Sequence, residues 1–418
     1  MSWVETTIGE FVEIKHGFAF KGEFFRNDGE YVVLTPGNCH NDGGFKAKGD
    51  KEKRYTGEVP KGYLLKKGDL LVVMTDLVGT APVLGGSFVI PEDNIYLHNQ
   101  RLGLVTLKEG VEADKGFFYH LFNTHDYRGQ IRGSASGATV RHTSPNRILA
   151  CRVKVPDLAS QKRIASALSA YDELIENNRR RIALLEEAVR LLYREWFVHF
   201  RFPGHEHVKI IDGVPEGWSI RLLPELCVGK NGIQTGPFGS QLHQSDYTFE
   251  GVPVVMPKDL KGFRISTDTI ARIPEEKAHE LGRHVMSVGD IVYGRRGDIG
   301  RRALIGEPED GFFCGTGCLR IRPDANKIRP LYLFETLGSA STAGFIANQA
   351  RGSTMLNLSA GALKNVPILC APNHLQTDFV DLAGTIRKQI EILASQSDQL
   401  ARARDLLLPR LMDGRLEV

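Results

Sequence analysis

Residues 161–196 read QKRIASALSAYDELIENNRRRIALLEEAVRLLYREW, and residues 376–411 read QTDFVDLAGTIRKQIEILASQSDQLARARDLLLPRL. In both stretches apolar residues recur in alternating steps of four and three, a spacing typical of helices that pack on one another. The two patterns share one frame, since the numbers of Phe379 and Ile164 differ by 379 − 164 = 215. A single stripe of this kind usually marks an amphipathic helix on a globular core. Two stripes in one frame favour two long helices that pack together.

The predicted coiled-coil interface takes most residues of the two seams, which also pass through Ala383 and Leu411. It comprises Ile164, Leu168, Tyr171, Ile175, Asn178, Ile182, Leu185, Val189, Leu192, Trp196, Phe379, Ile386, Ile390, Leu393, Ser397, Leu400, Arg404 and Leu407.

Other segments repeat at a similar distance. The offset from Trp3 to Trp218 is 218 − 3 = 215, and the offset between the loops that begin at Gly137 and Gly352 is 352 − 137 = 215. The segment GDLLVV at 68–73 returns as GDIVYG at 289–294. Each match is short, but their common order indicates that the chain contains one unit twice.

The predicted fold class is α/β, in a mixed α+β arrangement. Short β-type runs separated by Gly and Pro precede each helix, and a Pro/Gly-containing linker separates the halves. We expect two similar globular domains, each followed by a long helix, with pseudo-two-fold symmetry. The predicted boundaries are globular domain 1–156, helix 157–200, linker 201–214, globular domain 215–371, and helix with C-terminal tail 372–418.

An antiparallel pairing of the helices gives one testable register, although others stay open. With the symmetry axis near the middle of the seam, Asn178 faces Ser397, and Tyr171 faces Arg404, whose guanidinium could lie on the ring. A helix from 164 to 196 spans roughly 50 Å at about 1.5 Å per residue. Two-fold DNA readers place half-sites about 34 Å apart or multiples of that, so such a rod could hold two globules on one duplex.

Composition bounds the class of protein without deciding it. The 418 residues carry a formal charge of +3, which is too weakly basic to imply nucleic acid by itself. No apolar run reaches the length of about 18 residues that a spanning helix needs. The N-terminal residues lack the features of an export signal, and six scattered cysteines suit a reducing cytosol. We therefore expect a cytoplasmic protein.

No catalytic motif is present. The sequence lacks a phosphate-binding P-loop, a zinc-protease helix motif and a serine-hydrolase elbow. It has no Pro-Pro pair, so the loop with which adenine methyltransferases hold their target amino group is absent. Cys314 and Cys318 have no second cysteine pair nearby, and His205-Glu-His207 lies in the linker. Free thiols and a solvated loop are the favoured interpretations, so we predict no metal site.

Basic and polar loops are the candidates for binding. Residues 295–302, RRGDIGRR, concentrate four arginines after a predicted strand, and arginine suits phosphates and guanine edges. The alternatives are solvated hairpin tips and structural glycine turns. The candidate DNA-binding residues are Lys15, Lys21, Gln100, Arg101, Arg132, Ser134, Thr139, Arg141, Gln234, Ser240, Gln241, Arg295, Arg296, Arg301, Arg302, Arg351, Ser353, Thr354 and Asn357.

In this order, the motifs resemble the specificity (S) subunits of type I restriction–modification systems. The resemblance covers essentially the whole chain. It is carried by VPEGW at 214–218, GPFGS at 236–240, the Gly-Asp strands at Gly68 and Gly289, the loops at Gly137 and Gly352, VKVP at 153–156 leading to Gln161, WFVHF at 196–200 and LLPRLMDGR at 407–415. The chain departs from the family pattern in lacking Pro-Glu-Gly before Trp3. It also has Ser160-Gln161 and Leu375-Gln376 where Glu-Gln is usual.

The resemblance implies two target-recognition domains that read the halves of a bipartite, asymmetric DNA site. It implies partners, namely double-stranded DNA, methyltransferase (M) subunits and restriction (R) subunits, and no catalysis in this chain. S-adenosylmethionine, ATP and Mg²⁺ would belong to the partner subunits.

Two other classes of function remain open. One is the recognition part of a related or stand-alone methylation system, or an enzyme fused to recognition domains, which the missing motifs disfavour. The other is a coiled-coil assembly protein without a DNA role, which the small net charge permits.

Overall fold

The computed structural model describes residues 3–261, 264–267, 269–297, 299–350 and 357–417. The chain divides into two compact units, one formed by Met1–Arg180 with Ala394–Val418 and the other by Arg181–Leu393. Each unit therefore contains part of both long helices, α4 (Leu158–Phe197) and α9 (Asn373–Met412). We describe the two units separately.

In the first unit, a four-stranded sheet has the order β2-β10-β6-β8, and all its neighbouring strands are antiparallel. The central strand β6 is buried along its whole length, because its alternate residues face two different cores. Leu70 and Val72 pack toward the helices, and Leu71 and Val73 toward a second apolar cluster. The strands of this sheet are β2 (Val12–His16), β10 (Leu102–Leu107), β6 (Leu70–Val73) and β8 (Ser87–Val89).

Smaller elements surround this sheet. They are the pair β1 (Trp3–Thr7) with β12 (Arg152–Pro156), the pair β7 (Thr75–Asp76) with β11 (Arg141–His142), the small sheet of β3 (Phe25–Arg26), β5 (Arg54–Tyr55), β4 (Tyr31–Val33) and β9 (Tyr96–Leu97), and the helices α1 (Lys115–Phe122), α2 (His125–Ser134) and α3 (Pro145–Leu149).

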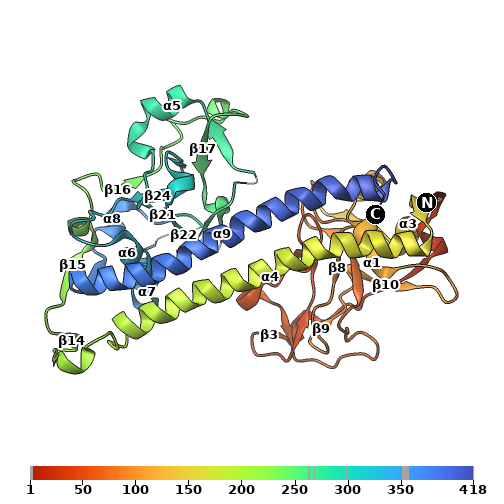
Figure 1. Cartoon of the computed structure of the whole chain (residues 1–418), viewed down its shortest axis with the longest axis horizontal. Coiled ribbons are helices and arrows are strands. Elements are labelled where there is room, and N and C mark those ends of the chain that lie inside the picture. Colours follow the sequence, from red (N-terminus) through yellow and green to blue (C-terminus); the bar gives the residue numbers. More distant parts are fainter. Residues whose placement is uncertain (1–2, 262–263, 268, 298, 351–356, 418) are drawn as a thin grey trace. The chain divides into compact units, whose positions relative to one another are not determined.

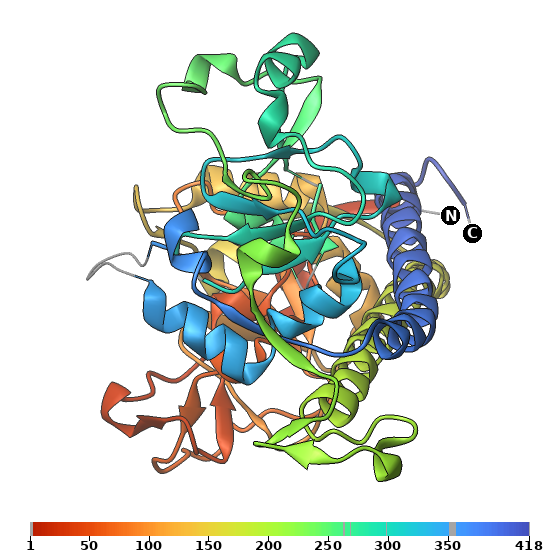
Figure 2. The ribbon, with the colours of Figure 1, turned by 90° about the vertical axis from the view of Figure 1, so that its left-hand side faces the viewer.

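The second unit repeats this plan. Its sheet has the order β16-β24-β21-β22, again antiparallel throughout, and in β21 Ile291 and Tyr293 face one core while Val292 faces another. The helices of residues 330–349, drawn in blue in Figure 2, pack through the first of these cores against the teal strands. The strands are β16 (Ile233–Thr235), β24 (Cys318–Ile321), β21 (Ile291–Gly294) and β22 (Arg302–Leu304).

The remaining elements of the second unit are mostly short. They are the pair β13 (Ile210–Ile211) with β14 (Val214–Pro215), the pair β15 (Ser219–Leu222) with β25 (Pro367–Cys370), the small sheet of β20 (Ala271–Ile273), β17 (Val252–Val255) and β23 (Phe313–Cys314), the pair β18 (Leu260–Lys261) with β19 (Arg264–Ile265), and the helices α5 (Glu275–Glu280), α6 (Pro330–Thr336), α7 (Ala340–Gln349) and α8 (Ala360–Leu363).

Within each unit the segments of α4 and α9 pack in opposite directions. In the second unit the end of α4 meets the start of α9 (Figure 1). The rings of Trp196 and Phe379 lie 6.4 Å apart between centroids. In the first unit the earlier part of α4 meets the later part of α9, where Arg404 Nη1 donates to Asp172 Oδ1 at 2.7 Å. The predicted fold class, with its antiparallel coiled coil, is therefore confirmed.

The predicted seam residues of α4 and α9 are shielded from solvent. None of the predicted interface residues is exposed, whereas Leu184 and Leu406, outside the frame, are 72% and 63% exposed. The register that pairs Asn178 with Ser397 stays a prediction. Arg404 lies next to the expected position, because its guanidinium donates to Asp172, the neighbour of Tyr171, and to two further carboxylates.

The first turn of each long helix is held by a buried glutamine. Gln161 Oε1 accepts from the backbone N–H of Asp114 at 2.9 Å, and its amide donates to the carbonyl of Pro156. Gln376 makes the same two contacts, with Arg329 N–H at 3.0 Å and the carbonyl of Ala371. Both side chains face inward, so these two glutamines do not offer a surface to a partner.

Candidate nucleic-acid interface

One end of the main sheet gathers the polar loops in each unit. Because the strands alternate in direction, the last residues of β16 and β21 lie beside the first residues of β24 and β22. The connected loops therefore meet. We call this surface the loop end of the second unit and define it by residues 236–241, 295–297, 299–301, 315–317 and Asn357.

Backbone hydrogen bonds hold the loop end together. Gly236 N–H donates to the carbonyl of Cys318, and Arg295 N–H to that of Gly317, both at 3.0 Å. Leu358 N–H donates to the carbonyl of Arg295 at 2.9 Å. A Cβ on Gly236 would lie 1.9 Å from the carbonyl oxygen of Gly315, so only glycine permits this close approach.

The first unit has an equivalent loop end, made of residues 17–21, 74–76, 99–101 and 136–142. Met74 N–H donates to the carbonyl of Arg101, and Thr143 N–H to that of Met74, both at 2.9 Å. A Cβ on Gly17 would lie 2.0 Å from the carbonyl oxygen of Asn99. The glycine turns expected as a structural alternative are thus structural, and they also bring the candidate loops together.

The arginines of residues 295–302 divide into two kinds. Arg296 and Arg301 are exposed at the loop end. Arg295 is buried, its Nε and Nη2 donate to Asn357 Oδ1 at 3.3 and 3.2 Å, and burial lowers its pKa. Arg295 therefore positions Asn357 and the neighbouring backbone.

Arg302 differs from the expectation that all four arginines face a duplex. Its Nε donates to the carbonyl of Phe334 at 2.9 Å, and its guanidinium lies 4.7 Å from the centroid of that ring. The side chain is buried, and burial lowers its pKa, while Glu335 acts in the opposite direction. Arg302 holds α6 to the sheet and is not part of the loop-end surface.

The other candidate residues of the second unit differ in their exposure. Ser240 is exposed and Gln241 half-buried in the loop after β16, while the Gln234 amide donates to the carbonyl of its neighbour Thr235. Arg351, Ser353 and Thr354 lie outside the described residues.

In the first unit, five candidates lie at the loop end. Gln100 and Thr139 are exposed, Arg101 is half-buried, and Arg141 Nη2 donates to the carbonyl of Arg132 at 2.7 Å. Lys21 also lies there, exposed and 3.9 Å from Glu23.

The remaining candidates of the first unit serve local contacts. Lys15 Nζ donates to the carbonyl of Gly62 at 2.8 Å and lies 4.3 Å from the centroid of Tyr63. Ser134 Oγ donates back to the carbonyl of Gln130 within α2.

Sequence reasoning missed a polar pair at the loop end of the first unit. Thr75 Oγ1 and His142 Nδ1 lie 3.1 Å apart, and Thr75 pairs with His142 along the backbone as Arg296 pairs with Asn357 in the second unit. The signal was available, because 357 − 142 = 215, the offset of the repeat. Phe238, 58% exposed, is a second missed residue, and an exposed aromatic ring suits stacking on a base.

No metal or membrane feature adds to these surfaces. Within the described part of the chain, no group of three or more His, Cys, Asp or Glu side chains is arranged to hold a metal ion. Among the same residues, no helix is long and apolar enough to cross a lipid bilayer. The six cysteines are all buried free thiols.

Comparison with known proteins confirms the resemblance seen in the sequence. Residues 1–187 match the type I restriction modification DNA specificity domain. The type I restriction enzyme MjaIX specificity subunit of Methanocaldococcus jannaschii is 24% identical over 362 residues, which cover 85% of this chain and 79% of that protein. The EcoBI specificity subunit of Escherichia coli is 23% identical over 427 residues, covering 98% and 83%.

A solved structure shares the fold. The crystal structure of the S subunit of a type I restriction–modification system from M. genitalium matches with a TM-score of 0.57 and 17% identity, over 99% of this chain and 96% of that chain.

Proposed function

We propose that this chain is the DNA sequence-recognition subunit of a type I restriction–modification complex, and that each loop end reads one half of a bipartite, asymmetric DNA site. The observation that carries the proposal is the repeated loop end, which in both units gathers Arg, Gln, Thr or Ser side chains on a rigid antiparallel sheet. These side chains can donate to phosphates and to base edges. The similarity to specificity subunits over most of the chain supports the same function.

The two loop ends differ in chemistry, which suits an asymmetric site. The second unit presents Arg296 and Arg301, and the first presents Gln100, Arg101 and His142, which buried Thr75 contacts. Arginine matches the acceptor pair of guanine, and glutamine matches the donor and acceptor of adenine. Unlike loops on a common frame would read unlike half-sites.

The outer faces of the long helices support the proposed docking of methyltransferase subunits. In the second unit, Leu184 and Leu191 lie seven residues apart on α4 and are 72% and 45% exposed, and Val198, directly after the helix, is 46% exposed. Leu382 and Ile392 of α9 are also more than half exposed. An apolar stripe of this kind is typical of a surface that another helix covers.

The proposed role includes no catalysis by this chain. S-adenosylmethionine, ATP and Mg²⁺ would be bound by the methyltransferase and restriction subunits, and the complex would act on chromosomal DNA in the cytoplasm. A purified chain that alone methylates or cuts DNA would contradict this part of the proposal.

The test begins by identifying the DNA site. Methylome sequencing of strains with and without the gene is expected to reveal one two-part motif with a fixed gap. With that duplex, R296A in the assembled complex should weaken binding about tenfold, as expected for one lost arginine contact. R201A, which removes an exposed arginine of the linker, is the control. If R296A changes neither affinity nor sequence preference, this loop does not read DNA.

A further inference from the structure

Positions related by the offset of the repeat occupy equivalent places in the two units. The matched contacts of Gln161 and Gln376 show this in space, since their partners Asp114 and Arg329 are related by the same offset, 329 − 114 = 215. The same equivalence extends along both helices and the α1 and α6 helices that cover them. It allows the residues at the two helix–domain junctions to be compared one by one.

At the junction of the first unit, an arginine of α9 is surrounded by carboxylates. Arg404 donates through Nη1 to Asp172 at 2.7 Å and through Nη2 to Asp42 at 2.9 Å, and it also bonds its neighbour Asp405. Its side chain is only 10% exposed. Burial acts to raise the pKa of Asp42, but the hydrogen bond and the positive charge of Arg404 together lower it.

Helix α1 completes this junction with groups that suit a carboxylate. Tyr119 Oη donates to Asp172 Oδ2 at 3.2 Å, and His120 Nδ1 lies 3.9 Å from the same oxygen. The carboxylate of Asp172 therefore accepts hydrogen bonds from Tyr119 of α1 and from Arg404 of α9.

At the junction of the second unit, the chemistry of the equivalent positions is inverted. Arg387 stands where the first unit has Asp172, and buried Val189 stands where it has Arg404. Phe334 replaces Tyr119, and Glu335 replaces His120. In the second unit, the cation Arg387 on α9 faces the ring of Phe334 and the acid Glu335. In the first unit, the anion Asp172 on α4 faces the phenol of Tyr119 and the guanidinium of Arg404.

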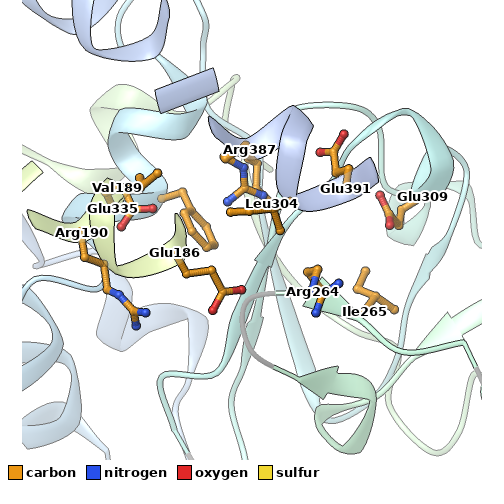
Figure 3. A pocket seen from close by; sticks show the side chains of 12 residues that line it. Glu186, Val189, Arg190, Arg264, Ile265, Leu304, Glu309, Glu335, Arg387 and Glu391 are labelled. Carbon is orange, nitrogen blue, oxygen red and sulfur yellow. The ribbon is translucent and has the colours of Figure 1, made fainter. Parts of the chain in front are cut away.

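This second junction contains a cavity of about 60 Å³. Figure 3 shows Arg387, Glu335 and Val189 among the side chains that line it, together with Glu186 and Arg190. The guanidinium of Arg387 lies 5.1 Å from the centroid of Phe334. Burial raises the pKa of Glu335, while Arg302, Arg387 and Arg190 act in the opposite direction. The junction tolerates Arg387 because acids and a ring surround it and the facing position is an uncharged valine.

We propose that this inversion is a pairing code, by which the half of the chain that carries α4 selects the half that carries α9 and rejects a second copy of itself. Each helix surface therefore fits the other half of the chain and not a second copy of the same half. The inference rests on the repeat and the junctions, and it holds whether or not the loop ends bind DNA.

The equivalence shows what self-pairing would do. If α9 packed on a second α9, Arg404 would take the place of Val189 and face Arg387, with Asp42 and Asp172 absent. If α4 packed on a second α4, Val189 would take the place of Arg404, and Asp172 and Asp42 would lose their partner. Both arrangements remove charge partners that the pairing of α4 with α9 supplies, and they leave partly buried charges less well compensated.

The mispaired junctions can be built inside the full chain. V189R/R190D gives the second unit the junction of an α9–α9 pair. We expect a lower urea midpoint of unfolding. The fluorescence of Trp196 and Trp218, which belong to this unit, reports the transition. R387D alone should also destabilise, because it adds an acid beside Glu335. The combined variant V189R/R190D/R387D recreates the Arg404–Asp172 pair of the first unit. Its folding equilibrium constant should be about tenfold higher than the value expected if the separate effects simply multiplied.

Val189→Met is the control for side-chain size, because it adds length without charge. Its effect on the folding equilibrium constant should simply multiply with that of R387D. The mirror experiment in the first unit is R404V/D405R, with D172R/H120E as the expected rescue. If R387D restores the stability of V189R/R190D no better than it restores that of V189M, packing alone explains the loss of stability. The pairing code is then wrong.

Discussion

Gly236 and Gly17 show how single residues decide the shape of the loop ends. Each follows the first strand of its sheet, and each has the backbone of a neighbouring loop where a Cβ would lie. Their role is close approach, since neither is among the residues with positive φ. Arg302 makes the same point for a charged residue, because its neighbours and not its type decide whether it faces solvent.

At this scale we predict that Gly236→Ala destabilises the second unit by about 1–3 kcal/mol, the usual range for overpacking. The loop after β16 would have to move away from Gly315, so DNA binding should weaken as well. Chemical denaturation measures the first effect. Gly239→Ala in the same loop is the control, because a Cβ there meets no atom within 4 Å. Equal effects of the two variants would contradict the packing argument.

The long helices illustrate the element scale. Their heptad repeat predicts which face is buried, and the exposed apolar residues fall outside that frame. In the second unit, Phe379 is fully buried and contacts the rings of Tyr193, Trp196 and Phe197. The start of α9 is therefore attached to the end of α4 by an aromatic cluster.

Phe379→Ala is expected to lower the free energy of unfolding by about 3–5 kcal/mol, as large-to-small changes in aromatic cores do. Leu382→Ala removes an apolar side chain of the same helix that is 51% exposed, and it should change stability little. Urea unfolding of the two full-length variants gives the comparison. A loss at Leu382 as large as that at Phe379 would mean that the seam is misassigned.

For the whole molecule, buried histidines contribute to the response to acid. Burial lowers the pKa of His98, His120 and His284 to about 4. The unfolded chain binds these protons near pH 6.5, so the stabilising contribution is present above that pH and is lost as the pH falls toward 4. The raised pKa of Glu335 acts in the opposite direction, because burial favours its protonated form.

We therefore expect the urea midpoint to fall between pH 7 and pH 5. The fall should be smaller in H98Q, which removes one of the titrating groups, whatever that variant's stability at pH 7. H207Q, at a histidine whose side chain is 83% exposed, should keep the pH dependence of the parent chain. A pH dependence unchanged in H98Q would show that His98 is not a source of the slope.

The sequence alone determined the duplication, the helical seams, the mixed α/β class and the family resemblance, because periodicity and order are written along the chain. It also pointed to the loops that carry Arg296, Gln100 and Thr139. The division of work within those loops was decided by tertiary structure. Arg295 and Arg302 became buried and Thr75 met His142 because sheet register and helix packing, which join residues distant in sequence, set each side chain's surroundings. The inverted charges of the two junctions became visible for the same reason, since only folding brings Asp172 to Arg404 and Arg387 to Glu335.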